Sequence, residues 1–239
     1  MPGLLGLVGG DEFKAGNEEQ DRFMAAAAGA GPAYVIPTAA ARGGPDEAVA
    51  HATRWFRTLG LALRELRVLK RSDAMSAALA NEARVGRFFY LVGGDPGHVA
   101  QVLRGSKVWA AVFAAWRDGA VLAGSSAGAM ALCSHTLIRA SWPNRFNRRP
   151  IEALGVVPRT AVLPHFDTFG HKWIESARAA APELTLLGID ERSAAVWDAG
   201  KWRALGPGAV TVVSGARVRR FEHGEQVTGL PQPARTLPG

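Results

Sequence analysis

The chain is poor in cysteine. Cys133 is the one cysteine among its 239 residues, which excludes an internal disulfide framework and a zinc site built on cysteines. We interpret Cys133 as a small buried hydrophobic residue. No apolar run reaches the roughly 18 residues that a membrane-spanning helix needs, and the apolar start of the chain carries no basic leader. We therefore expect a cytoplasmic protein with no membrane partner.

Acidic residues are also fewer than basic ones. The 28 lysines and arginines exceed the 21 acidic residues, so the formal net charge is +7. Such a balance can indicate nucleic-acid binding, but the arginines are mostly scattered along predicted helices, and we expect no nucleic-acid partner. One stretch differs. Between Asp118 and Glu152 there is no acidic residue, and the segment contains Arg139, Arg145, Arg148 and Arg149. It is either a solvated basic loop or a positive field for an acidic substrate group.

Composition and patterning favour a single α/β domain. Hydrophobic residues make up 48% of the chain, enough for a sizeable core. Strand-like and helix-like segments alternate, which is typical of a mostly parallel sheet between helices on both faces, a three-layer sandwich. We expect strands at 4–8, 33–37, 66–69, 88–92, 120–123, 161–163 and 184–189, and helices at 18–28, 46–59, 74–83, 99–103, 108–116 and 171–180. Short strands at 194–197, 202–205 and 210–213 are expected to form antiparallel hairpins. Residues 1–223 are the expected domain and 224–239 a flexible tail.

The most informative motif follows the predicted strand at 120–123. It reads Gly124-Ser125-Ser126-Ala127-Gly128, with a helix-compatible segment after it. This is the pattern of a nucleophile elbow, a sharp strand-to-helix turn that exposes one serine hydroxyl. Glycines two residues before and after the serine allow close backbone approach. The alternative is an ordinary turn without chemistry, but the flanking segments favour the elbow and make Ser126 the leading candidate nucleophile.

A serine hydroxyl needs a base within hydrogen-bond reach and an oxyanion hole. One donor is expected from the N–H of Ala127 and the other from the loop Gly93-Gly94, which follows another predicted strand. Among the six histidines, His165 ranks first as the base because it directly follows a strand behind a proline. We place His135 at the far end of the elbow helix, too far from Ser126. His98 follows the glycine loop, where we expect it to touch substrate.

These segments resemble a known family. The elbow, the loop Val92-Gly93-Gly94-Asp95 and the segment Leu163-Pro164-His165-Phe166 resemble the S51 serine peptidases, which include aspartyl dipeptidases (peptidase E) and cyanophycinases. The segment Gly188-Ile189-Asp190-Glu191 is similar to one in the cyanophycinase branch. The resemblance implies a flavodoxin-like fold similar to class I glutamine amidotransferases. It also implies Ser126 as nucleophile, His165 as base, Gly94 with Ala127 as oxyanion hole, an aspartyl substrate, and no metal or cofactor.

The third member of the triad is the weak point of the resemblance. The place where the family usually has it corresponds to residues 141–144, which contain no acid. We favour Asp167, two residues after His165, because residues two apart in a strand point to the same side. Glu152 or Glu191 could orient the imidazole instead, or the site could be a weak Ser-His dyad. For substrate contacts we select Asp95, His98, Arg145, Glu191 and Arg192.

The leading hypothesis is a serine hydrolase that cleaves a peptide or amide bond beside an acidic residue. The alternative is a catalytically weak or inactive relative that binds a peptide or small molecule, since fold alone does not establish chemistry. The two differ in whether a carboxylate reaches the His165 ring. A glutaminase-type amidotransferase is disfavoured because Cys133 lies beyond the elbow. The expected partner is a small acidic peptide, and the oligomeric state stays open, a homodimer being one option.

Overall fold

The computed structural model describes residues 1–140 and 147–237. Within them, eight strands form one large sheet. In spatial order these are β14 (Gln226–Val227), β11 (Lys201–Leu205), β10 (Ala194–Asp198), β1 (Leu5–Val8), β5 (Val121–Ser125), β4 (Phe88–Leu91), β2 (Ala33–Ile36) and β3 (Leu63–Glu65). The five strands from β1 to β3 run parallel, and β10, β11 and β14 extend the sheet as antiparallel strands.

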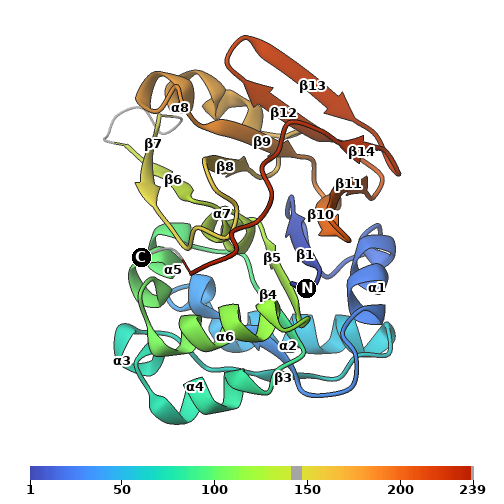
Figure 1. Cartoon of the computed structure of the whole chain (residues 1–239), viewed down its shortest axis with the longest axis vertical. Coiled ribbons are helices and arrows are strands. Elements are labelled where there is room, and N and C mark those ends of the chain that lie inside the picture. The colour runs from blue at the N-terminus through green and yellow to red at the C-terminus, as the bar shows by residue number, and fades with distance from the viewer. Residues whose placement is uncertain (141–146, 238–239) are drawn as a thin grey trace.

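Helices cover both faces of this sheet (Figure 1). They are α1 (Glu18–Ala26), α2 (Pro45–Thr58), α3 (Arg71–Ala74), α4 (Ala77–Arg84), α5 (Pro96–Leu103), α6 (Lys107–Arg117), α7 (Ala127–Leu132) and α8 (Ile174–Ala180), with 3-10 turns η1 (Thr38–Ala40) and η2 (Gly170–Trp173). Alternation along β4 shows why two faces need cover. Phe88 and Tyr90 join the core beneath α1 and α2, whereas Phe89 and Leu91 join the core beneath α4 to α7, because successive side chains of a strand point to opposite faces.

A second sheet packs against the α4–α7 side of the core. It has four strands in the order β13 (Arg217–Phe221), β12 (Val210–Ser214), β9 (Thr185–Ile189) and β8 (Thr160–Leu163). The pair β8–β9 is parallel, and the others are antiparallel. A separate two-stranded ribbon consists of β6 (His135–Arg139) and β7 (Arg148–Glu152). Figure 1 shows β12 and β13 at the opposite end of the molecule from α3 and α4.

The predicted fold class, an α/β sandwich around a mostly parallel sheet, is confirmed. Some details differ. The third parallel strand is β3, slightly before the expected 66–69. The helix after the elbow ends at Leu132, so His135 begins β6 instead of ending that helix. The strands at 194–198 and 201–205 form the expected hairpin, but β12 belongs to the second sheet.

The expected separation of a tail at residue 224 does not appear. Strand β14 pairs with β11, and Val227 is buried. Further along, the indole N–H of Trp202 donates to the Pro231 carbonyl at 2.9 Å, and the Ala234 N–H donates to the Val156 carbonyl at 2.8 Å. Trp197 of β10 and Trp202 of β11 thus bind the C-terminal segment through their indole N–H groups. The Pro- and Gly-rich composition of that segment does not predict these contacts.

Candidate active site

Ser126 occupies a strained turn between β5 and α7. Its φ is +47° and its ψ is −110°, a region that L residues rarely adopt. A Cβ at Gly124 would lie 2.6 Å from the Gly128 backbone, and one at Gly128 would lie 2.2 Å from the Leu91 carbonyl oxygen. Both flanking positions therefore require glycine. This is the backbone geometry typical of a nucleophile elbow.

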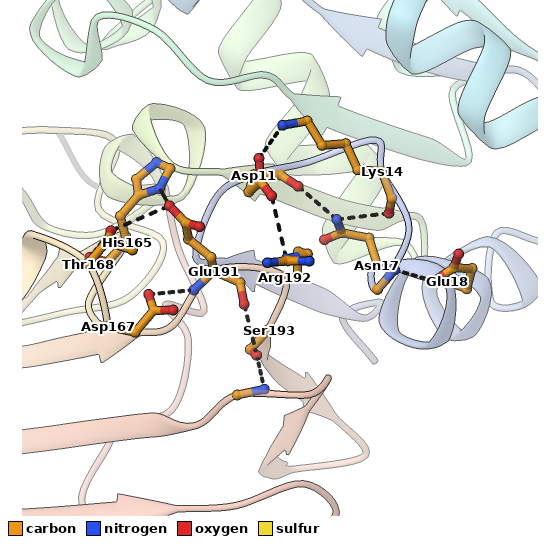
Figure 2. Close-up of polar contacts among 12 residues, drawn as sticks. Asp11, Lys14, Asn17, Glu18, His165, Asp167, Thr168, Glu191, Arg192 and Ser193 are labelled. Atoms are coloured by element: carbon orange, nitrogen blue, oxygen red, sulfur yellow. Dashed lines mark hydrogen bonds and ion pairs between the residues drawn. The ribbon is translucent and has the colours of Figure 1, made fainter.

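The imidazole of His165 lies between Ser126 and a carboxylate. Its Nε2 is 3.2 Å from Ser126 Oγ, and its Nδ1 is 2.7 Å from Glu191 Oε1. Figure 2 shows the contact between His165 and Glu191. The His165 and Glu191 side chains are only 19% and 22% exposed, and the Phe169 ring stacks on the imidazole at 4.8 Å between centroids. Carboxylate, imidazole and hydroxyl thus stand in the order of a serine hydrolase triad.

The carboxylate at the imidazole is that of Glu191, and the expectation that Asp167 contacts the ring was wrong. The expectation assumed an extended strand through residues 165–167. Instead His165 has a φ of +49°, and its carbonyl accepts hydrogen bonds from the N–H groups of Phe169 and Gly170, at 2.9 and 2.8 Å. The chain therefore turns at His165, and Asp167 points elsewhere. Its Oδ1 accepts the Glu191 N–H at 3.0 Å (Figure 2), so it contacts the backbone of the residue that meets the ring.

A cavity of about 570 Å³ opens in front of Ser126 and His165. Gly94 and Ala127, the two candidate oxyanion donors, both line it. Gly94 has a φ of +139°, and a Cβ there would lie 2.2 Å from the Ala39 carbonyl oxygen, so the loop needs glycine at this position. Asp95 also lines the cavity, but its Oδ1 caps α5 by accepting the His98 N–H at 3.1 Å.

Two arginines of the β6–β7 ribbon line the same cavity. Arg139 and Arg148 are direct cross-strand partners, a placement that is unfavourable for like charges unless an anion lies nearby. The Arg148 guanidinium lies 4.0 Å from the centre of the Trp173 ring. Burial, together with the charge of Arg139, lowers the pKa of Arg148. Among the arginines of the acid-free segment that the structure describes, these two line the cavity of the candidate site.

The remaining predicted residues lie elsewhere. His98 does not line the cavity. Its ring contacts Leu69 instead, with Nε2 2.8 Å from the Leu69 carbonyl oxygen. Arg192 faces Asp11, with Nε 3.4 Å from Oδ2. Glu152, an alternative acid, pairs with Arg104 at 2.6 Å. Arg145 lies outside the described residues.

The remaining observations concern Cys133, metal ions and the membrane. Cys133 is fully buried, and burial raises the pKa of its thiol, so it has the character of a core residue instead of a nucleophile. Among residues 1–140 and 147–237, no cluster of His, Cys, Asp and Glu is suited to hold a metal ion. In the same described part of the chain, no helix combines the length and apolarity needed to cross a membrane.

From sequence, Glu191 is expected to contact substrate and is only one of the alternative acids, whereas the structure places its carboxylate at the His165 ring. The signal in the sequence is its position, since Glu191 ends the segment Gly188-Ile189-Asp190-Glu191, directly after the predicted strand at 184–189. Phe169 and Trp173 also line the cavity. They belong to no recognisable sequence motif and were not predicted.

Comparisons with known proteins show the family and the fold. The family model "Peptidase family S51" matches residues 5–205. Cyanophycinases of Trichormus variabilis and of a Nostoc species are each 30% identical over 216 residues, covering 87% of this chain and 72% of theirs. A crystal structure of a peptidase from an acI-B1 Actinobacterium superposes with a TM-score of 0.81 at 29% identity, covering 95% of this chain and 97% of the other.

A more distant structure supports the fold alone. It is a candidate peptidase E protein from Listeria monocytogenes, with a TM-score of 0.57 and 17% identity, which covers 95% of this chain and all of the other. The match of the family model over most of the chain, the cyanophycinase similarity and the serine-centred geometry agree. The chain belongs to peptidase family S51, a family of peptidase-type hydrolases.

Proposed function

We propose that this protein is a serine peptidase that cleaves a peptide or amide bond next to an acidic residue through an acyl-enzyme on Ser126. The observation that carries the proposal is the continuous set of contacts from Glu191 through His165 to Ser126, at 2.7 and 3.2 Å. Glu191 would keep the proton of His165 on Nδ1. Nε2 is then free to accept the Ser126 proton.

In the first half of the reaction, Ser126 Oγ attacks the scissile carbonyl carbon as its proton passes to His165 Nε2. The carbonyl oxygen becomes an oxyanion, for which the N–H groups of Gly94 and Ala127 are the candidate donors, as both residues line the cavity. The carbon–nitrogen bond then breaks, and the leaving amine takes the proton from Nε2. In the second half, water gives a proton to Nε2 and attacks the ester, and Ser126 leaves with that proton.

The arginine pair supports the acidic specificity. Arg139 and Arg148 project from one ribbon into the cavity that holds Ser126. A guanidinium binds a carboxylate through paired charge-assisted hydrogen bonds, and two guanidinium groups that line one cavity give it a positive field for a substrate carboxylate. The cyanophycinases to which this chain is similar fit this proposal, since the family resemblance implies aspartyl substrates. Cleavage of Asp-X dipeptides and of β-aspartyl-arginine would distinguish an α-aspartyl from a β-aspartyl substrate.

The contact of Glu191 with the ring also favours catalysis over a purely binding role, because the binding alternative assumed that no carboxylate reaches His165. A small acidic peptide remains the proposed partner. No nucleic acid is proposed, since Arg139 and Arg148 line the cavity that holds Ser126. A homodimer and a cytoplasmic location remain expectations from sequence.

The deciding experiment compares wild type with Ser126→Ala on a panel of Asp-X dipeptides and β-aspartyl-arginine, with Asn-X dipeptides as neutral controls. We expect wild type to cleave an aspartyl substrate and Ser126→Ala to lose activity by about 10⁴-fold or more. Ser76→Ala removes the cap of α4, outside the cavity, and should leave activity unchanged. Equal activity of Ser126→Ala and wild type would contradict the proposal, as would preference for the neutral peptides.

A further inference from the structure

The connection between β1 and α1, residues 9–17, contacts the parts of the candidate site that carry the base and the acid. The His165 N–H donates to the Gly9 carbonyl at 2.7 Å. Gly10 lies close against the imidazole, since a Cβ there would be 2.4 Å from His165 Nε2. The Arg192 N–H, next to Glu191, donates to the Gly10 carbonyl at 2.9 Å. This connection therefore fixes the two turns that present His165 and Glu191.

Glu12, in the same connection, joins the two other parts. Its Oε1 accepts the Gly93 N–H at 3.0 Å, and its Oε2 accepts the Ser125 hydroxyl at 2.9 Å. Gly93 precedes the candidate oxyanion donor Gly94, and Ser125 precedes Ser126. A Cβ at Gly93 would lie 2.7 Å from Glu12 Oε1, so the close approach of the carboxylate depends on glycine there. One side chain thus links the oxyanion loop to the elbow.

The backbone around Glu12 is held in place from several sides. Its neighbours Asp11 and Phe13 have φ values of +55° and +60°, and such strained conformations persist only where the surroundings determine them. Asp11 contacts Lys14 and Arg192, and its carbonyl accepts the Asn17 amide at 2.8 Å (Figure 2). The Phe13 ring packs 5.3 Å from that of Tyr90. The carboxylate of Glu12 therefore stands on a braced loop.

From these contacts we infer that Glu12 is a positioning residue, which sets the oxyanion loop against the elbow without touching substrate. The inference rests on the proposed function. Glu12 does not line the cavity that holds Ser126, so it has no place among the reacting groups. Oxyanion donors act only when they lie at hydrogen-bond distance from the developing charge, and small misplacements can lower rates about a hundredfold. Bonds to a carboxylate are stronger than neutral ones, which suits a group that must hold a loop.

The test uses Glu12→Ala, Ser125→Ala and their combination on the preferred aspartyl substrate. We expect Glu12→Ala to lower kcat by about 10- to 100-fold while KM stays within about threefold. Ser125→Ala should also lower kcat, because it removes the hydrogen bond from Ser125 to Glu12. The double variant should have the same kcat as Glu12→Ala, because Glu12→Ala already removes that bond. Glu12→Gln should recover most of kcat, since its amide can accept from Gly93 and donate to Ser125. Glu18→Ala, which removes a carboxylate that accepts the Gly16 N–H, is the matched control.

A second readout does not depend on turnover. Loss of the bond to Glu12 should speed amide hydrogen exchange at Gly93 by about tenfold in Glu12→Ala, with no change in Glu18→Ala. Unchanged exchange at Gly93 or unchanged kcat in folded Glu12→Ala overturns the inference. If Glu12→Ala does not fold, Ser125→Ala takes its place, and an unchanged kcat in Ser125→Ala overturns the inference. If wild type turns over no substrate while Gly93 exchange still accelerates, the proposed function fails and Glu12 stands as the link between loop and elbow.

Discussion

The two sheets contribute different halves of the candidate site. The large sheet supplies Ser126 after β5 and Gly94 after its parallel neighbour β4. The small sheet supplies His165 after β8 and Glu191 after its parallel neighbour β9. In each sheet two parallel strands end at the same edge, where backbone turns present side chains beyond the strand ends. The half with Ser126 and the half with His165 and Glu191 are therefore built by the same principle, and Ser126 and His165 both line the cavity.

The halves differ in how they hold their key residue. The elbow presents Ser126 through its own backbone turn, with a φ of +47° at Ser126, and through two flanking glycines at which a Cβ would clash. The small sheet instead brings together His165 and Glu191, which are 26 residues apart, by the register that pairs Leu163 with Gly188. Local geometry governs one half and strand pairing governs the other. The contrast predicts that the half with His165 depends on one specific carboxylate.

The largest expected effect in this comparison is that of Glu191→Gln. The amide can donate a hydrogen bond to Nδ1 and so favour the wrong imidazole tautomer, and we expect kcat to fall by about 10³- to 10⁴-fold. Asp167→Asn is the matched change. Its amide oxygen can still accept the Glu191 N–H, so we expect a loss below about fivefold, the scale of one neutral hydrogen bond. Steady-state kinetics on the same aspartyl substrate measure both.

Reversal of that order, with Asp167→Asn the more damaging variant, would show that the small sheet presents a different carboxylate during turnover. Equal small losses would instead indicate a Ser-His dyad. Thermal unfolding of each variant checks that a loss of kcat is not a loss of fold.

This contrast also explains which parts of the site could be predicted from sequence. The elbow, the Gly93-Gly94 loop and His165 are local patterns, and the structure brings all three together. The Glu191 contact depends on the pairing of β8 with β9 and on the turn at His165 with its φ of +49°. Neither the strand pairing nor the turn can be predicted from the sequence around residue 165. The alternating segments of the parallel sheet were predictable for the same reason as the elbow, whereas the C-terminal segment packs through contacts that are distant in sequence.

Neither sheet supplies the cations that face the cavity, which come from the β6–β7 ribbon. We expect Arg139→Gln and Arg148→Gln each to lower kcat/KM for an aspartyl dipeptide by about 10- to 100-fold, the scale of one charge-assisted hydrogen bond. The loss should be mainly in KM, and cleavage of the neutral Asn-X control should not fall. Arg149→Gln is the control, because Arg149 belongs to the same strand but does not line the cavity. Equal losses for acidic and neutral peptides would assign the pair a structural role and leave the specificity to other groups.

The smallest expected effect concerns stability, where the sheets again differ. Each sheet has a buried aspartate packed beside it or at a strand end. Asp190, at the end of β9, has its pKa raised by burial, but the Ala209 N–H and Arg220 partly offset this. Asp21, on α1 beside the large sheet, has a pKa raised to about 7 by burial. Its Oδ2 accepts the Trp55 indole N–H at 2.7 Å, and its Oδ1 has no partner among the described residues.

The sign of the pH effect follows from that raised pKa. Between the ordinary aspartate pKa and about 7, the folded state holds a proton on Asp21 that the unfolded state has lost, so the free energy of unfolding falls as pH rises. From pH 5.5 to 8.5 this one group should lower the free energy of unfolding by about 2 kcal/mol.

Asp21→Asn imitates the protonated form and should remove this pH dependence. Urea unfolding at both pH values should therefore show the variant gaining on wild type by about 2 kcal/mol at the higher pH. Asp190→Asn should gain less, because Arg220 already balances the charge of Asp190. Parallel pH profiles for Asp21→Asn and wild type would mean that Asp21 is ionised in the folded protein, and the two sheets would then bury their aspartates in the same way.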